Sequence, residues 1–126
     1  MRFLEKLEAR MEAANSLLCV GLDPVLAQIP AHFHTAPDFI FAFNKWIIDQ
    51  THEYVCAFKP NSAFYESSGE QGIVALKKTF EYLRENYPEI PTILDAKRGD
   101  IGHTNAEYAK FAFEYLGADD ITLQPY

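Results

Sequence analysis

Apolar and polar positions alternate in blocks along the chain, and the period changes in a regular order. Short continuous apolar runs of strand length precede longer stretches in which apolar residues recur every three or four positions, the spacing of an amphipathic helix. The pattern predicts a first helix over residues 2–14, followed by strands and helices in alternation. The predicted strands are 17–22, 55–58, 92–97 and 121–123, and the predicted helices between them are 37–54, 70–87 and 103–116.

Each predicted helix has one apolar face, which we expect to be buried. The spacing is clearest in the third helix, where five residues lie 3, 4, 3 and 4 positions apart: Ile73, Leu76, Phe80, Leu83 and Tyr87. The second helix is expected to bury Phe39, Ile40, Phe43, Trp46, Ile47 and Tyr54. The last is expected to place Thr104, Tyr108, Phe111 and Tyr115 on one side and to end at Gly117, a typical C-cap residue.

Strands that alternate with helices indicate a parallel sheet joined by right-handed crossovers. The first predicted strand ends in Gly21-Leu22-Asp23-Pro24, which is not a glycine-rich phosphate fingerprint, so a dinucleotide-binding fold is disfavoured. We therefore predict the α/β class and a (β/α)8 TIM barrel. The chain would be a single domain over residues 1–126, covering an N-terminal helix and roughly strands 1 to 4. A complete barrel needs roughly 200 residues or more, so four strands make half of one.

Composition narrows the class of protein further. The 126 residues are 48% hydrophobic and 23% charged, which is typical of a globular domain. The net charge of −7 argues against a nucleic-acid partner. The apolar runs are too short for a membrane span, and the start of the chain lacks the pattern of a signal peptide. We therefore expect a cytoplasmic protein without a membrane partner.

The cysteines and histidines give little sign of a metal or a disulfide. Cys19 and Cys56 are the only cysteines, and strand alternation predicts that they are buried, inert thiols on opposite faces of the sheet. His32 and His34 form an HxH pair in a proline-flanked loop, without the third or fourth ligand that zinc requires. No metal site is expected.

Charged residues follow three of the predicted strands. Asp23 follows the first strand, Lys59 the second, and Asp95 and Lys97 end the third. The carboxyl ends of parallel strands lie on one rim, where barrel and open-sheet enzymes place their chemistry. A structural ion pair is the simpler explanation of a single acid beside a lysine. An acid, a base and an acid-base pair on one rim favour a catalytic site that handles protons.

Three segments, in this order, resemble orotidine 5'-phosphate decarboxylase, in the branch with an extended loop after strand 2. They are Val20-Gly21-Leu22-Asp23-Pro24, Phe58-Lys59-Pro60-Asn61 with Ala63-Phe64-Tyr65-Glu66, and Asp95-Ala96-Lys97-Arg98-Gly99-Asp100-Ile101-Gly102-His103-Thr104. The resemblance runs from about residue 15 to Tyr126, the end of the family's fourth strand. It implies a dimeric barrel, without metal or organic cofactor, that converts orotidylate to UMP in de novo pyrimidine biosynthesis.

The resemblance also implies roles for matching residues. Asp23 would bind the ribosyl or pyrimidine side of the nucleotide, and Lys59 would contact the ribose and belong to the charged network. Asp95 would lie beside the substrate carboxylate, and Lys97 would donate a proton to C6 once CO2 leaves. A fixed ammonium suits that chemistry, because it stabilises the charge that develops on the ring carbon and then neutralises it.

Other matching residues would serve a neighbouring subunit. The resemblance implies that Asp100 reaches across a homodimer into the partner's site, with Ile101 and Thr104 beside it as substrate-binding residues. In this family the phosphate-binding arginine comes from the region of strands 7 and 8, which the four predicted strands do not include.

Two other functions remain open. A sugar-phosphate decarboxylase or epimerase of the same superfamily would share the Asp-x-Lys-x-x-Asp core and use a divalent metal, although the Arg98-Gly99-Asp100-Ile101 continuation argues against it. A non-catalytic half-barrel would act only as an interaction or assembly unit, since the phosphate-binding region is missing from the four predicted strands.

Overall fold

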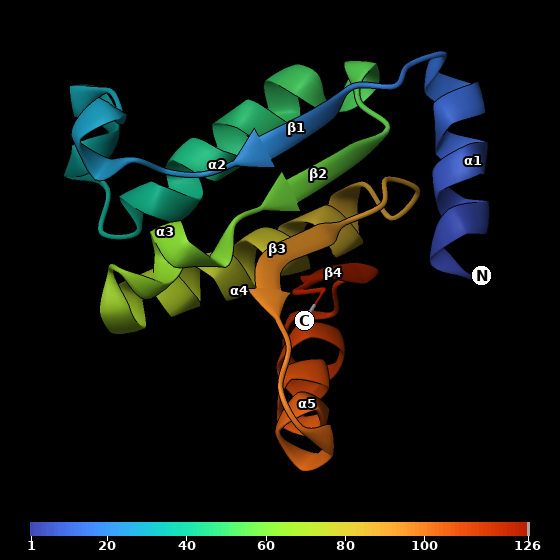
Figure 1. Cartoon of the computed structure of the whole chain (residues 1–126). Helices are drawn as coiled ribbons and strands as arrows, with labels where there is room; N and C mark the ends of the chain where they lie inside the picture. Colours follow the sequence, from blue (N-terminus) through green and yellow to red (C-terminus); the bar gives the residue numbers. More distant parts are fainter. Residues whose placement is uncertain (126) are drawn as a thin grey trace.

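The computed structural model describes residues 1–125 and has the predicted order of strands and long helices, with one additional short α-helix over Ser62–Glu66 (Figure 1). The helices are α1 (Phe3–Ala14), α2 (Phe39–Thr51), α3 (Ser62–Glu66), α4 (Gly69–Asn86) and α5 (Gly102–Ala109), which continues as a π-helix over Lys110–Leu116. The strands are β1 (Cys19–Leu22), β2 (Ala57–Pro60), β3 (Ile93–Arg98) and β4 (Asp120–Leu123). Short 3₁₀ helices lie at Leu26–Gln28, Ala31–Thr35 and His52–Tyr54.

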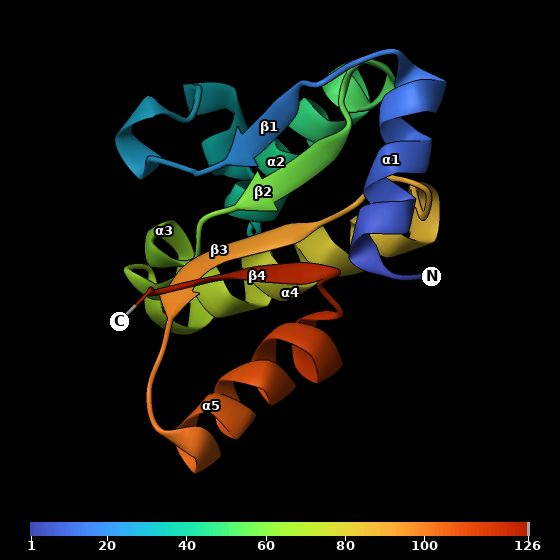
Figure 2. The same ribbon diagram turned by 45° about the vertical axis from the view of Figure 1, so that its right-hand side comes forward.

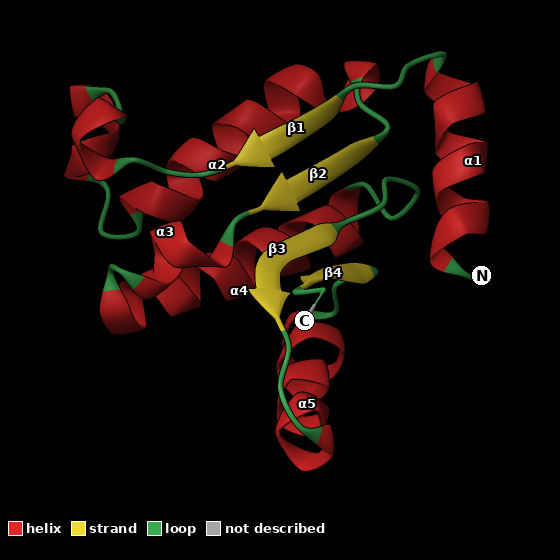
Figure 3. Ribbon diagram, in the orientation of Figure 1, coloured by secondary structure: helices red, strands yellow, loops and turns green. Residues whose placement is uncertain are grey.

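The four strands are parallel and lie in sequence order. β1 pairs with β2, and β3 pairs with β4. Isolated bridges from Phe58 to Thr92 and from Asn61 to Asp95 join β2 to β3. Helices α2 and α4 cover one face of the strands, and α1 lies at their amino-terminal ends (Figures 1 and 3). This arrangement confirms the predicted α/β fold class. The chain forms part of a (β/α) barrel.

The helix-covered face of the sheet holds the hydrophobic core. Leu22, Phe58 and Leu94 are at most 2% exposed and pack beneath α2 and α4. The predicted stripe on α4 supplies Leu76, Phe80 and Leu83 to the same core. Because full burial of each such side chain contributes roughly 1.5–3 kcal/mol, this face provides most of the driving force for folding.

A polar cluster lies inside this core. The Asn44 amide donates to the Tyr65 hydroxyl at 2.8 Å and to the Thr79 hydroxyl at 3.0 Å. Tyr65 in turn donates to the Leu22 carbonyl at 2.6 Å, just before Asp23. Burial raises the pKa of the Tyr65 phenol, so it stays a neutral donor. The cluster therefore joins α2, α3 and α4 to the end of β1.

Replacing Tyr65 by phenylalanine is expected to destabilise the fold by about 1–3 kcal/mol, because the buried Leu22 carbonyl and Asn44 amide both lose a partner. Urea denaturation measures the change. Tyr54→Phe is the matched control, since Tyr54 is 62% exposed and should change stability by less than about 0.5 kcal/mol. Equal stability of Tyr65→Phe and the parent would contradict this role.

Several boundaries and faces differ from the predictions. β1 begins at Cys19, opposite Ala57, rather than at Leu17, and the preceding Leu17 and Leu18 are 79% and 51% exposed. Trp46 and Tyr54 were expected in the core and are exposed, and the buried face of α2 instead consists of Ile40, Asn44 and Ile48. That face tolerates a polar residue because the amide nitrogen of Asn44 donates to both Tyr65 and Thr79, which a hydropathy pattern does not show.

The last helix shows a further correction. Its second half is a π-helix, whose wider turn buries Ala112 and Leu116 and leaves Tyr115 45% exposed. Gly117 ends it in the left-handed conformation, with φ 74°, which confirms the predicted C-cap. β4 ends at Leu123, and the last residue of the predicted family match, Tyr126, lies outside the described residues.

The prediction that both thiols are buried is wrong for Cys19. Both cysteines are free, as expected, but only Cys56 is buried. Cys19 alternates with Val20 and Leu22, which turn toward the helices, so its side chain lies on the sheet face that α2 and α4 leave open. Within residues 1–125, no helix is both long enough and apolar enough to cross a membrane.

Candidate active site

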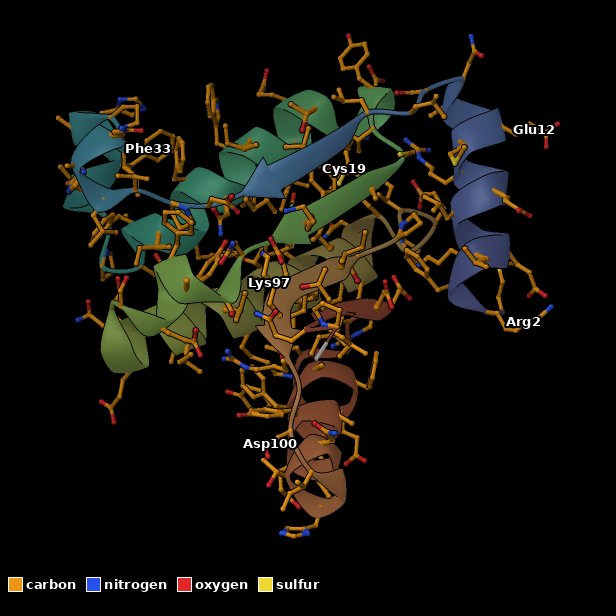
Figure 4. The ribbon with its side chains drawn as sticks, in the orientation of Figure 1. Arg2, Glu12, Cys19, Phe33, Lys97 and Asp100 are labelled. Atoms are coloured by element: carbon orange, nitrogen blue, oxygen red, sulfur yellow. The ribbon has the colours of Figure 1, made fainter. Side chains whose placement is uncertain are left out.

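Strand alternation assembles the predicted charged residues on the open face of the sheet. Phe58 and Leu94 turn toward the helices, so Lys59 and Asp95 turn the other way. The register aligns Lys59 with Gly21 and Asn61 with Asp95. Lys97 lies at the carboxyl end of β3 (Figure 4). The prediction that β2 and β3 bring their charged residues to one rim is therefore confirmed.

Asp95 lies at the centre of this cluster and is 7% exposed. Its Oδ1 accepts hydrogen bonds from Lys97 Nζ at 2.6 Å and from the Thr122 hydroxyl at 2.8 Å. Its Oδ2 accepts from Lys59 Nζ at 3.1 Å and from Asn61 Nδ2 at 3.2 Å. Each carboxylate oxygen thus has one ammonium and one neutral donor, which satisfies a charge that would otherwise be costly to bury.

These contacts fix the protonation state of the carboxyl group. The hydrogen bond from Lys97 lowers the pKa of Asp95 to about 2, with further lowering by Thr122 and Lys59, although burial opposes the shift. Asp95 is therefore ionised at neutral pH and holds two lysines beside it. The side chains of Lys59 and Lys97 are 34% and 57% exposed, so both ammonium groups can also face a ligand above the sheet.

Lys97 has an unusual backbone. Its φ is +50°, a left-handed conformation that costs a residue with a side chain about 1 kcal/mol or more. The register of β3 against β4 shifts here, so that Asp95, Ala96 and Lys97 lie opposite Thr122 alone. Simple alternation predicts that Asp95 and Lys97 share a face. The structure brings their side chains together through this bulge, which aims the lysine back at the acid.

Asp23 joins the cluster through Asn61. Its Oδ1 accepts the backbone N–H of Asn61 at 3.1 Å, while the side chain of Asn61 contacts Asp95. Asn61 follows β2 and thus lies between Asp23, which follows β1, and Asp95 of β3. Asp23 therefore lies on the same rim as Asp95, as predicted.

The rest of the third motif lies away from this cluster. The chain leaves the sheet after β3, and Asp100 lies well apart from Lys97 (Figures 2 and 4). Asp100 Oδ1 accepts the N–H of Ile101 at 2.7 Å, and Asn105 binds both backbone groups of Asp100, which shapes the turn into α5. Ile101 is 62% exposed, and Thr104 lies in the first turn of α5. The structure does not bring these three residues to the Asp95 cluster of their own chain.

Arg98 also points elsewhere. Its guanidinium pairs with Glu66 at the end of α3 and lies over the ring of Tyr108, 5.4 Å from its centroid. Of the four charged residues in the six-residue stretch from Asp95 to Asp100, only Asp95 and Lys97 therefore belong to the cluster.

Sequence reasoning missed two members of the site as functional residues, Asn61 and Thr122. Asn61 lies two positions after Lys59, and alternation alone places it on the same face. Thr122 is the one hydroxyl residue within the apolar run of β4, and a polar residue in such a run is a signal that a partner lies opposite.

The histidine pair has structural partners. His34 stacks on Phe39 and its Nε2 lies 3.0 Å from the Ile29 carbonyl, while His32 packs at a tilt against Phe33, with 4.3 Å between the ring centroids. Among residues 1–125, no group of three or more His, Cys, Asp or Glu side chains is placed to hold a metal ion. A divalent cation at Asp95 would have to displace the two ammonium groups already bound there.

Residues 16–126 match the family model described as the orotidine 5'-phosphate decarboxylase / HUMPS family. The chain is 52% identical over 122 residues to the orotidine 5'-phosphate decarboxylase of Flavobacterium johnsoniae, covering 97% of this chain and 45% of that protein. It is 50% identical over 128 residues to the enzyme of the same name from Cellvibrio japonicus, covering 100% and 46%. The chain thus spans less than half the length of these curated relatives.

Solved structures of related proteins also superimpose on this chain. The chain superimposes on the Leishmania donovani UMP synthase with a TM-score of 0.84 and 42% sequence identity, covering 100% of this chain and 25% of that one. The Leishmania donovani OMP decarboxylase gives a TM-score of 0.78 and 39% identity, covering 98% and 44%. The similarity includes all four strands, and hence the rim on which the Asp95 cluster lies.

Proposed function

Because the chain belongs to the orotidine 5'-phosphate decarboxylase / HUMPS family, we propose that the protein carrying it converts orotidine 5'-phosphate to UMP and CO2. The observation that carries this proposal is the Lys59–Asp95–Lys97 arrangement, in which one buried carboxylate holds two ammonium groups at the rim of the sheet. The reaction belongs to de novo pyrimidine biosynthesis.

Lys97 is the proposed proton donor. Loss of CO2 leaves an electron pair on C6 of the pyrimidine ring, where little delocalisation is available. The Lys97 ammonium stabilises this developing charge and then transfers a proton to C6. The left-handed backbone and the 2.6 Å contact with Asp95 support this role, because they hold a long and half-exposed side chain in one position.

Asp95, Lys59 and Asp23 position the lysine and the substrate. Asp95 holds the Lys97 ammonium in place and lies beside the substrate carboxylate, where its own negative charge repels that carboxylate and so destabilises the ground state. Lys59 contacts the ribose, and Asp23 binds the ribosyl or pyrimidine side. In support, Lys59 is paired but one-third exposed, and Asp23 is held toward Asn61 rather than toward another charge.

The working unit we propose is a homodimer. Asp100 reaches the partner's site, with Ile101 and Thr104 beside it as substrate-binding residues. Two observations support this arrangement: the turn at Asp100 lies away from the Asp95 cluster of its own chain, and Ile101 is 62% exposed there. Residues 1–126 would be one structural unit of a cytoplasmic enzyme, working without a metal or an organic cofactor.

A spectrophotometric assay with the purified protein carrying this chain tests the proposal. We expect orotidylate absorbance to be lost at the same rate in EDTA and in added Mg2+, because the charge on C6 is met by Lys97 rather than by a metal ion. Activity that disappears in EDTA would instead support a metal-dependent sugar-phosphate type of enzyme. A folded protein that neither binds UMP nor consumes orotidylate would support a non-catalytic half-barrel.

A further inference from the structure

The Thr122 hydroxyl makes three hydrogen bonds at one point of the site. It donates to Asp95 Oδ1 at 2.8 Å, and it accepts the backbone N–H groups of Ala96 at 3.1 Å and of Lys97 at 3.0 Å. One donor and two acceptor positions are the full capacity of a threonine hydroxyl. Thr122 therefore contacts both the carboxylate that binds Lys97 and the backbone that carries it.

The two N–H groups need this acceptor because of the bulge. In a regular parallel sheet, the N–H groups of two consecutive residues point to the strands on opposite sides. Here three residues of β3 lie opposite Thr122 alone, and both N–H groups point to β4. The side-chain oxygen of Thr122 takes the place of a carbonyl oxygen for two consecutive amides. This contact holds Lys97 at its φ of +50°, which its own side chain disfavours.

We propose that Thr122 is a positioning residue, whose hydroxyl fixes the bulge of β3 so that the Lys97 ammonium stays against Asp95 and is aimed at the substrate. This inference rests on the proposed function for its catalytic consequence. The structural half of the proposal, that the Thr122 hydroxyl holds the bulge, depends only on its contacts with Asp95, Ala96 and Lys97. The hydroxyl acts through Lys97 and need not touch the substrate.

The same pair of strands offers a matched control. The Thr92 hydroxyl lies at the amino-terminal end of β3, where it donates to Asp119 Oδ2 at 3.1 Å and is itself 6% exposed. The Thr92 hydroxyl also accepts the backbone N–H of Asp119 at 3.2 Å, so Thr92, like Thr122, is hydrogen-bonded between β3 and the chain of β4, but it lies at the opposite end of β3 from Lys97. Thr92→Val and Thr122→Val remove the same group from the same sheet, so a purely structural hydroxyl should behave alike in both.

The experiment compares Thr122→Val, Thr122→Ser and Thr92→Val in the protein carrying this chain. For Thr122→Val we expect kcat, corrected for the folded fraction, to fall about 10- to 100-fold with KM within about threefold, because a misplaced proton donor affects the chemical step. Thr122→Ser keeps the hydroxyl and should restore kcat to within about threefold of the parent. Thr92→Val should leave kcat unchanged while lowering stability.

Amide hydrogen exchange tests the structural half without relying on turnover. In Thr122→Val the Ala96 and Lys97 amides should exchange about tenfold faster, since each loses its acceptor, while Thr122→Ser and Thr92→Val keep their protection. Unchanged exchange at both amides, or equal losses of kcat in the two valine variants, would overturn the proposal. If the parent does not consume orotidylate, the proposed function fails and the exchange result alone decides the role of Thr122.

Discussion

Replacing Lys97 by alanine should abolish orotidylate turnover and leave the protein folded. The ammonium group is the proposed source of both the charge that stabilises the C6 electron pair and the proton that quenches it. Removing both effects should lower kcat by about 10³-fold or more. The fold should persist because the Lys97 side chain is 57% exposed and lies outside both hydrophobic clusters.

Lys110→Ala is the control for the Lys97 variant. Lys110 is also a half-exposed lysine paired with an acid, Glu107, at 2.7 Å, but it lies on the last helix rather than on the rim. We expect its turnover to match that of the parent. Near-normal turnover in Lys97→Ala would contradict the assignment of the proton donor, whereas loss of the circular dichroism signal would show that the lysine has a structural role instead.

The second large effect concerns Asp95 and the pH dependence of stability. The pKa of Asp95 lies at about 2 in the folded protein, below the ordinary 3.8. A lowered pKa means that the folded state stabilises the charged carboxylate relative to the protonated acid. The resulting stabilisation is fully present above about pH 4 and is lost as pH falls toward 2, by about 2 kcal/mol in all.

Asp95→Asn should therefore lose this part of the acid dependence and be less stable at neutral pH. Its amide would leave Lys59 and Lys97 without a counter-charge, so we also expect turnover to fall by about 10²-fold or more. Urea denaturation from pH 2 to 7 measures the first effect. Asp38→Asn is the control, because Asp38 pairs with Lys78 at the surface and should contribute less than about 1 kcal/mol. The same acid dependence in Asp95→Asn and the parent would contradict the argument.

Strand alternation and the position of charges at strand ends are local properties. They were enough to predict that Lys59, Asp95 and Lys97 lie together, although the contact of Lys97 with Asp95 is made through a bulge that they do not predict. They were also enough for the order of the strands and the long helices, because each strand is a short apolar run next to a helix of different period, but the five-residue helix α3 was not predicted. The resemblance of three short motifs then identified the family, which the comparisons confirm over residues 16–126.

The features that sequence could not predict depend on tertiary partners. Asn44 is buried in α2 because Tyr65 and Thr79 meet it there, while Trp46, which is far more apolar, stays 48% exposed. Cys19 is exposed because the helices cover only the other face of β1. The bulge at Lys97 follows from the pairing of β3 with Thr122 of β4, 25 residues later, and no local pattern reports it.

The most direct test of the central claim is to follow the carboxyl carbon and C6 together. Carboxyl-labelled orotidylate is incubated with the protein carrying this chain in D2O containing EDTA. We predict labelled CO2 and UMP in equal amounts, with deuterium at C6 in the parent protein and neither product above background in Lys97→Ala. Full CO2 release in Lys97→Ala, or release in the parent only after a divalent metal is added, would contradict the claim.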